Sequence, residues 1–97
     1  MTKGYWVVNN IVHDLEKYED YKKLVAAAFE IYGGRFIVRG GQQQDREGLN
    51  HPRSIVVEFP SYTAAIACYD SSEYNDALQL RLGIADGSLI IVEGYDG

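Results

Sequence analysis

The sequence predicts one α+β domain, with strand and helix patterns in the order β-α-β-β-α-β. Three observations predict this class. Four short segments are rich in β-branched and aromatic residues, as strands are. Between the first two, apolar residues recur at helical spacing, and between the last two, capping and stop residues indicate further helices. The two middle strands also share a consistent pairing register. A chain of 97 residues has room for a single domain, which we predict over residues 1–97.

The first strand and the first helix follow each other directly. Residues 4–12 are rich in β-branched and aromatic side chains and predict a strand. Asp14 is a suitable N-cap for the helix that follows, and apolar residues recur at helical spacing over residues 18–32. The glycine pair at 33–34 ends this helix, because glycine readily takes the left-handed conformation of a C-cap.

Two strands flank a polar loop in the middle of the chain. Residues 35–39 and 53–59 predict the strands, and the Gln- and Gly-rich residues 40–52 predict the loop. As a hairpin, the strands pair Phe36 with Val57 and Val38 with Ile55, so that four apolar side chains share one face. The same register sets Arg35 opposite Glu58 and Arg39 opposite Ser54, and it places both arginines and Glu58 on the other face.

The second helical region is predicted in two pieces. Ser61 caps a short helix that reaches about residue 69, and residues 70–72 form a break with a fresh cap. A further helix runs to Leu82, and residues 87–94 predict the last strand. Right-handed crossovers place the helices on one face of the sheet. The predicted fold is therefore a ferredoxin-like βαββαβ sandwich with a four-stranded antiparallel sheet.

The first and last predicted strands are apolar on both faces. The alternating side chains are Tyr5 and Val7 against Trp6 and Val8 in the first, and Leu89 and Ile91 against Ile90 and Val92 in the last. Strands of this kind imply that the second face is covered as well. A second copy of the chain is the simplest cover, so we expect a homodimer. The alternative is ordinary surface apolarity, which is common for single residues.

Composition limits the binding partners and the cellular compartment that we expect for this protein. A net charge of −5 disfavours binding to nucleic acid, and no apolar run approaches the length of a membrane-spanning helix. The single cysteine, Cys68, fits a reducing cytosol, so we expect a cytoplasmic protein. We predict no cofactor, because one Cys and two His are too few for a zinc site and no phosphate-binding motif is present.

An ordered set of short motifs resembles an uncharacterised family of the dimeric α/β-barrel superfamily. The motifs are Lys3-Gly4-Tyr5-Trp6, Tyr32-Gly33-Gly34-Arg35-Phe36, Arg39-Gly40-Gly41, Glu47-Gly48, Glu58-Phe59-Pro60-Ser61-Tyr62, Ser71, Glu73-Tyr74, Arg81 and Glu93-Gly94. The resemblance implies ferredoxin-like protomers whose sheets face each other in a dimeric barrel. It implies no activity, because the superfamily includes cofactor-free monooxygenases, lactone isomerases and haem-handling proteins.

Arg39 and Glu58 are the first candidate ligand-binding residues. The predicted register places both on the sheet face away from the helices, which a dimer would enclose. A charge kept there is costly unless it is paired, and an arginine fork suits a carboxylate ligand. The alternative is that Glu58 merely pairs with Arg35 across the strands.

His13, Tyr69 and Tyr74 are second candidates. His13 lies beside a helix cap and titrates near neutral pH, although a histidine there is commonly a surface turn residue. Tyr69 and Tyr74 flank the break between the helical pieces and could line an entrance. Together the candidates suggest that the dimer binds or transforms a small polar or aromatic molecule in a cavity on the sheet face away from the helices. An enzyme of this kind would use proton transfer or cofactor-free oxidation. The alternative is a non-catalytic structural or interaction dimer.

Overall fold

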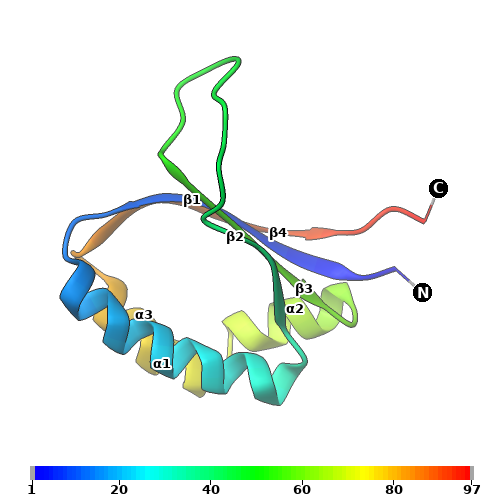
Figure 1. The fold of residues 1–97 in the computed structure, drawn as a ribbon. Coiled ribbons are helices and arrows are strands. Elements are labelled where there is room, and N and C mark those ends of the chain that lie inside the picture. The colour runs from blue at the N-terminus through cyan, green and yellow to red at the C-terminus, as the bar shows by residue number, and fades with distance from the viewer. Residues whose placement is uncertain (1, 97) are drawn as a thin grey trace.

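The computed structural model describes residues 2–96, in which three helices cover one face of a four-stranded sheet (Figure 1). The elements are β1 (Gly4–Val12), α1 (Leu15–Tyr32), β2 (Arg35–Arg39), β3 (Arg53–Phe59), α2 (Tyr62–Tyr69), α3 (Ser72–Arg81) and β4 (Ala85–Glu93). The strands lie in the order β2-β3-β1-β4, and each neighbouring pair is antiparallel. This arrangement confirms the predicted ferredoxin-like sandwich.

Side-chain caps begin all three helices, at the predicted Asp14 and Ser61 and at Ser71 within the predicted break over residues 70–72. The Asp14 carboxylate accepts a hydrogen bond from the backbone N–H of Lys17 at 3.1 Å, and the hydroxyls of Ser61 and Ser71 do the same for α2 and α3. Gly33 ends α1 with φ of 77°, a conformation that favours glycine. Local capping chemistry therefore determines where the helices begin.

The last helix and strand differ slightly from their predicted bounds. α3 ends at Arg81, one residue before the predicted end. β4 begins at Ala85, two residues early, and ends at Glu93, one residue before the predicted end. The early start follows from pairing, because Ala85 lies opposite Val12 at the end of β1.

The hairpin of β2 and β3 begins in the predicted register and then shifts. Its pairs are Arg35 with Glu58, Phe36 with Val57, Val38 with Val56 and Arg39 with Ile55. The predicted pairings of Val38 with Ile55 and of Arg39 with Ser54 are therefore wrong, because Ile37 occupies the extra position of a β-bulge. Arg39 consequently lies on the helix-facing side of the sheet with Phe36, whereas Val38 lies on the outer face.

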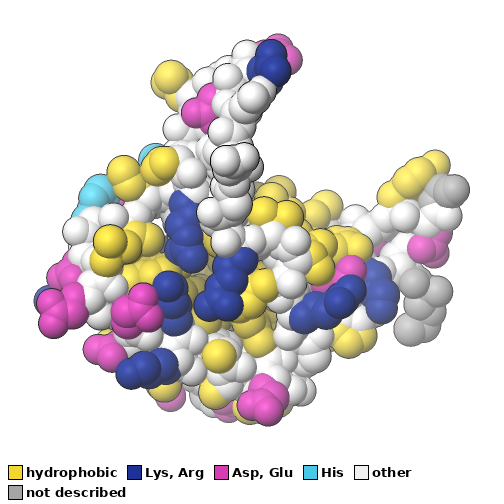
Figure 2. All heavy atoms as spheres, in the orientation of Figure 1, with side chains coloured by type: hydrophobic (Ala, Val, Ile, Leu, Met, Phe, Trp, Pro, Cys, Tyr) yellow, Lys and Arg dark blue, Asp and Glu magenta, His cyan; other side chains and the backbone are white. Residues whose placement is uncertain are grey.

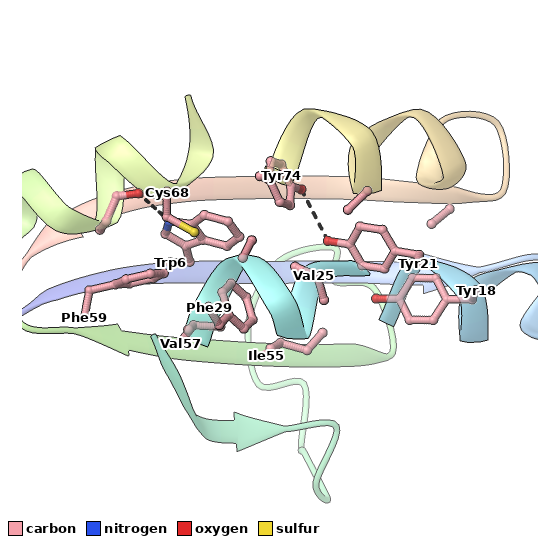
Figure 3. Close-up of a cluster of buried hydrophobic side chains, with 14 residues drawn as sticks. Trp6, Tyr18, Tyr21, Val25, Phe29, Ile55, Val57, Phe59, Cys68 and Tyr74 are labelled. Carbon is pink, nitrogen blue, oxygen red and sulfur yellow. Dashed lines mark hydrogen bonds between the residues drawn. The ribbon is translucent and has the colours of Figure 1, made fainter. Parts of the chain in front are cut away.

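The core lies between the helices and the sheet and centres on Trp6 (Figure 3). Its side chain is 1% exposed, and its ring meets that of Phe29 edge to face with the centroids 5.2 Å apart. The indole Nε1 donates a hydrogen bond to the Ala65 carbonyl at 2.9 Å, which links β1 to α2. Cys68 is buried in the same core.

The opposite, outer face of the sheet carries an apolar patch. It is formed by Tyr5, Val7, Val38, Val56, Ile90 and Val92. Val7 lies between Val56 and Ile90 on the neighbouring strands, so the patch is continuous across the sheet. Ile90 is 56% exposed. The predicted two-sided apolar character of β1 and β4 is thus present in the folded chain.

Candidate functional site

A cavity of about 210 Å³ lies between the sheet and helices α1 and α3. Its apolar wall comes from the core and the inner faces of the strands, namely Trp6, Val8, Val25, Phe29, Phe36, Ile55, Val57 and Leu89. Figure 2 shows hydrophobic side chains exposed in a hollow between α1 and the sheet, with Lys and Arg side chains gathered around it. The cavity therefore combines an apolar interior with a basic surround.

Four cations contribute to the cavity wall, and no acidic residue among residues 2–96 lines it. The cations are Lys22 from α1, Arg39 from β2, Arg53 from β3 and Arg81 at the end of α3. Lys22 forms an ion pair with Glu19, with Nζ and Oε1 3.1 Å apart. Within the described residues, the three arginines form no ion pair. Positive charge is thus concentrated at one cavity of a protein whose net charge is −5.

Aromatic rings hold two of these arginines in place. The Arg39 guanidinium lies 4.3 Å from the centre of the Phe36 ring, and the Arg53 guanidinium lies 5.1 Å from the centre of the Tyr18 ring. Arg53 also passes beside Gly40, where an added Cβ would lie 3.2 Å from its Nε. The two guanidiniums thus come from adjacent strands, and both are positioned by cation–π contacts.

Two buried polar atoms of the cavity wall have no hydrogen-bond partner among the described residues: Asn10 Oδ1 and Arg81 Nε. Asn10 is only 3% exposed. It lies between Arg53 on β3 and Gly87 on β4. Unpaired buried polar atoms are rare, because each costs free energy relative to its hydrated state. One of the two is an acceptor and the other a donor.

Tyrosines form the helical side of the site. Tyr21 lines the cavity, and its hydroxyl lies 3.3 Å from that of buried Tyr74 (Figure 3). Burial, reinforced by Tyr74, raises the pKa of Tyr21 well above its ordinary value, so the phenol is protonated at neutral pH. Burial works to lower the pKa of Arg81, but Tyr74 and Tyr21 offset this effect and the net shift is upward. Arg81 is therefore cationic.

The predicted site residues lie in three places: at the cavity, beside Asp86, and on the outer face of the sheet. Arg39 and Tyr69 line the cavity, and Tyr74 lies just behind its wall, where its ring centre is 5.0 Å from that of Tyr69. His13 lies outside the cavity lining, in an exposed pair with Asp86 whose Nε2 and Oδ2 are 2.7 Å apart. The structure therefore brings Arg39, Tyr69 and Tyr74 together and leaves His13 apart from them.

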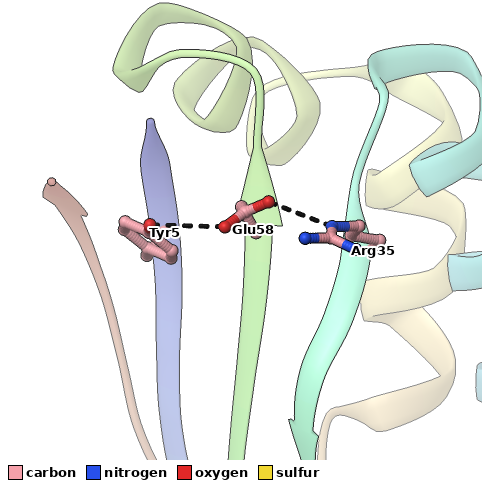
Figure 4. Close-up of polar contacts among 3 residues, drawn as sticks. All are labelled: Tyr5, Arg35 and Glu58. Carbon is pink, nitrogen blue, oxygen red and sulfur yellow. Dashed lines mark hydrogen bonds and ion pairs between the residues drawn. The ribbon is translucent and has the colours of Figure 1, made fainter. Parts of the chain in front are cut away.

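Glu58 lies on the outer face, between Arg35 and Tyr5 (Figure 4). Its carboxylate accepts a hydrogen bond from Arg35 Nε at 3.0 Å and another from the Tyr5 hydroxyl at 3.3 Å. The hydrogen bond from Arg35 is the main cause of the lowered pKa of Glu58. This is the cross-strand pair that the sequence left open as an alternative.

Sequence reasoning missed Lys22, Asn10, Arg53 and Arg81 as site residues. Side chains alternate between the two faces of a strand, so residues an even number of positions apart share a face. Asn10 follows buried Trp6 by four residues and Arg53 precedes buried Ile55 by two, so both could have been placed on the buried face. Arg81 follows Tyr74 by seven residues, which places both on one face of α3. A polar residue on an otherwise buried face is therefore the signal that was available.

No group of His, Cys, Asp and Glu in residues 2–96 could hold a metal ion. None of the helices described in that range is long and apolar enough to cross a membrane.

The fold and the cavity define a small ferredoxin-like α+β protein with an arginine-lined cavity between its helices and its sheet. The chain belongs to the DUF1330 family, a domain of unknown function, whose pattern matches residues 3–95. This match confirms the resemblance to an uncharacterised family drawn from the sequence motifs. A search of curated proteins finds no match.

Solved structures share the fold at low sequence identity. The RPA0582 protein of unknown function from Rhodopseudomonas palustris matches with a TM-score of 0.78 and 17% identity, over 99% of this chain and 85% of that chain. SnoaB, a cofactor-independent oxygenase from Streptomyces nogalater, matches with a TM-score of 0.64 and 13% identity, over 100% and 97% of the two chains. A conserved protein from Methanosarcina mazei Go1 matches with a TM-score of 0.54 and 18% identity, over 100% and 95%.

Proposed function

We propose that this protein binds a small molecule with an apolar body in the cavity between the helices and the sheet. The observation that carries the proposal is the set of three arginines without ion-pair partners around an apolar interior. Like charges that line one cavity repel one another, and a bound anion relieves this repulsion. The structural neighbour SnoaB is a cofactor-independent oxygenase, an activity compatible with a site that handles an organic molecule.

We propose also that the protein acts as a homodimer in which a second copy covers the outer face. The apolar patch on that face supports this arrangement, since an exposed continuous apolar surface favours association. The cavity lies on the other side of the sheet, so ligand binding and pairing use different faces. A structural dimer without a ligand is the competing function, and it gives no role to the unpaired arginines.

Thermal unfolding with a panel of small carboxylic acids tests the proposed ligand site. An acid that binds the folded state should raise the melting temperature, and Arg39→Met should abolish that increase because it keeps the aliphatic stem and removes the charge. Arg46→Met is the matched control, since Arg46 is exposed in the loop and outside the cavity lining. No shift with any acid, together with destabilisation by Arg39→Met, would favour the structural dimer.

A further inference from the structure

We propose that the ligand is a single-ring aromatic carboxylate that carries a ring hydroxyl, an inference that rests on the small-molecule function proposed above. The size of the cavity limits the body of the ligand. A cavity of about 150 Å³ lined by apolar side chains binds benzene. The cavity in this protein, at about 210 Å³, therefore fits one ring with one or two small substituents.

The rings of the wall favour an aromatic body over an aliphatic one. Trp6, Tyr18, Tyr21, Phe29, Phe36 and Tyr69 all line the cavity. Aromatic pairs gain from edge-to-face and offset contacts beyond the area that they bury. The protein already uses such contacts in this region, where Trp6 meets Phe29 and Tyr69 at interplanar angles of 75° and 72°. A ligand ring would extend this packing.

Arg39 and Arg53 define the position of the carboxylate. The guanidinium of each lies over a ring of the wall, and Arg53 passes within 3.2 Å of the position of a Cβ on Gly40, the neighbour of Arg39. Lys22 Nζ lies 5.8 Å from the centre of the Tyr18 ring that Arg53 also contacts. A planar carboxylate suits arginine forks, and the absence of an acidic side chain in the described lining leaves them free for one.

The two unpartnered atoms define the second polar group. Asn10 Oδ1 requires a donor and Arg81 Nε requires an acceptor. Both residues line the cavity: Asn10 lies between Arg53 on β3 and Gly87 on β4, and Arg81 lies just before β4. A hydroxyl is the smallest group that both donates and accepts. A ring hydroxyl that reaches these two atoms would therefore satisfy polar groups that an unsubstituted ring leaves without a partner.

Titration calorimetry with benzoate, the three hydroxybenzoate isomers and phenol tests this assignment. At least one hydroxybenzoate should bind about fivefold tighter than benzoate, as one added neutral hydrogen bond allows, and phenol should bind more weakly than either acid. Arg53→Met should weaken the acids about tenfold and leave phenol unchanged. Asn10→Leu, of similar volume, should reduce the advantage of the best hydroxybenzoate over benzoate, because the hydroxyl then loses one of its two partners.

The outcomes separate this inference from the proposed function. Equal affinity for benzoate and all hydroxybenzoates would overturn the hydroxyl, and phenol binding as tightly as the acids would overturn the carboxylate. In both cases the cavity would still bind a small molecule. Binding of none of the five compounds would overturn the inference and remove the main support for the proposed function. If Asn10→Leu does not fold, the comparison of Arg53→Met with Arg46→Met still decides the carboxylate.

Discussion

Tyr21 and Tyr74 meet through their hydroxyl oxygens at 3.3 Å and thereby connect α1 to α3 at the wall of the cavity. Both side chains are buried, and their rings lie nearly perpendicular, at 80°. We expect Tyr21→Phe and Tyr74→Phe each to lower the free energy of unfolding by about 1 kcal/mol, the usual contribution of a buried neutral hydrogen bond. Urea unfolding of both variants and the double variant measures the coupling.

The double variant provides the decisive comparison for this pair. If the hydroxyls stabilise the fold through each other, the double substitution should cost less than the sum of the single costs. Tyr95→Phe is the control, because its side chain is exposed and it should leave stability unchanged. Strictly additive costs for Tyr21 and Tyr74 would contradict a direct interaction.

Because Tyr21 and Tyr74 are buried, we expect the protein to lose stability in alkaline solution. Burial raises the pKa of both tyrosines above the value of 10.0 that they have when unfolded. Stability is therefore unaffected below pH 10 and falls above it, because the unfolded chain then releases protons that the folded chain retains. Each tyrosine contributes a slope of up to about 1.4 kcal/mol per pH unit. Urea unfolding between pH 9 and 11 should show a shallower decline for Tyr21→Phe, and equal slopes would contradict the shift.

Gly87 is the backbone position where a side chain is least tolerated near the site. Its φ is 150°, and an added Cβ would overlap the Asn9 carbonyl oxygen and lie 2.7 Å from Asn10 Cα. We expect Gly87→Ala to destabilise the protein by roughly 1–3 kcal/mol, measured by thermal unfolding. Gly41→Ala is the matched control, since an added Cβ there meets nothing within 4 Å. Equal stability of the two variants would contradict the close approach of β4 to β1.

The pKa of Glu58 reports the contact with Arg35 in solution. Arg35 is the main cause that lowers this pKa below the ordinary value of 4.5. The pairing thus favours the fold above the unfolded pKa, and its contribution is lost as the pH falls through the folded value. A carboxyl ¹³C titration should give a lowered pKa in the parent and a value closer to 4.5 in Arg35→Gln. An unchanged pKa in that variant would place the cause elsewhere.

The proposed dimer makes the outer face sensitive to charge. Sedimentation equilibrium of the parent at micromolar concentration should give about twice the chain mass of 10.9 kDa. Ile90→Glu puts a charge in the apolar patch and should yield the monomer, since an unpaired buried charge is costly. Ile31→Glu, on the exposed side of α1, should leave the assembly unchanged. A monomeric parent would end the dimer proposal.

Local sequence signals were sufficient for the elements of this fold. The caps at Asp14, Ser61 and Ser71 act through side-chain oxygens close in the chain to the N–H groups that they satisfy, so sequence spacing reveals them. The start of β4 was harder, because it depends on pairing with β1, which no local pattern reports.

The candidate site was predicted less well, and one residue explains most of the difference. A bulge at Ile37 turns Arg39 from the outer face to the cavity, and nothing in the alternation of β2 distinguishes this geometry from a regular hairpin. Arg81 reaches the cavity only because α3 packs against α1 through Tyr21 and Tyr74. The contact between α1 and α3 depends on tertiary packing, which the pattern of residues along the chain does not specify.

The position of Trp6 gives the protein an optical probe of its own. It is the one tryptophan in the sequence, it is almost fully buried, and its ring lines the cavity beside Tyr69. Its fluorescence therefore originates from a single environment shared by the core and the candidate site. Emission recorded during unfolding follows the solvation of the core, and emission recorded during titration follows what enters the cavity, without any label attached to the chain.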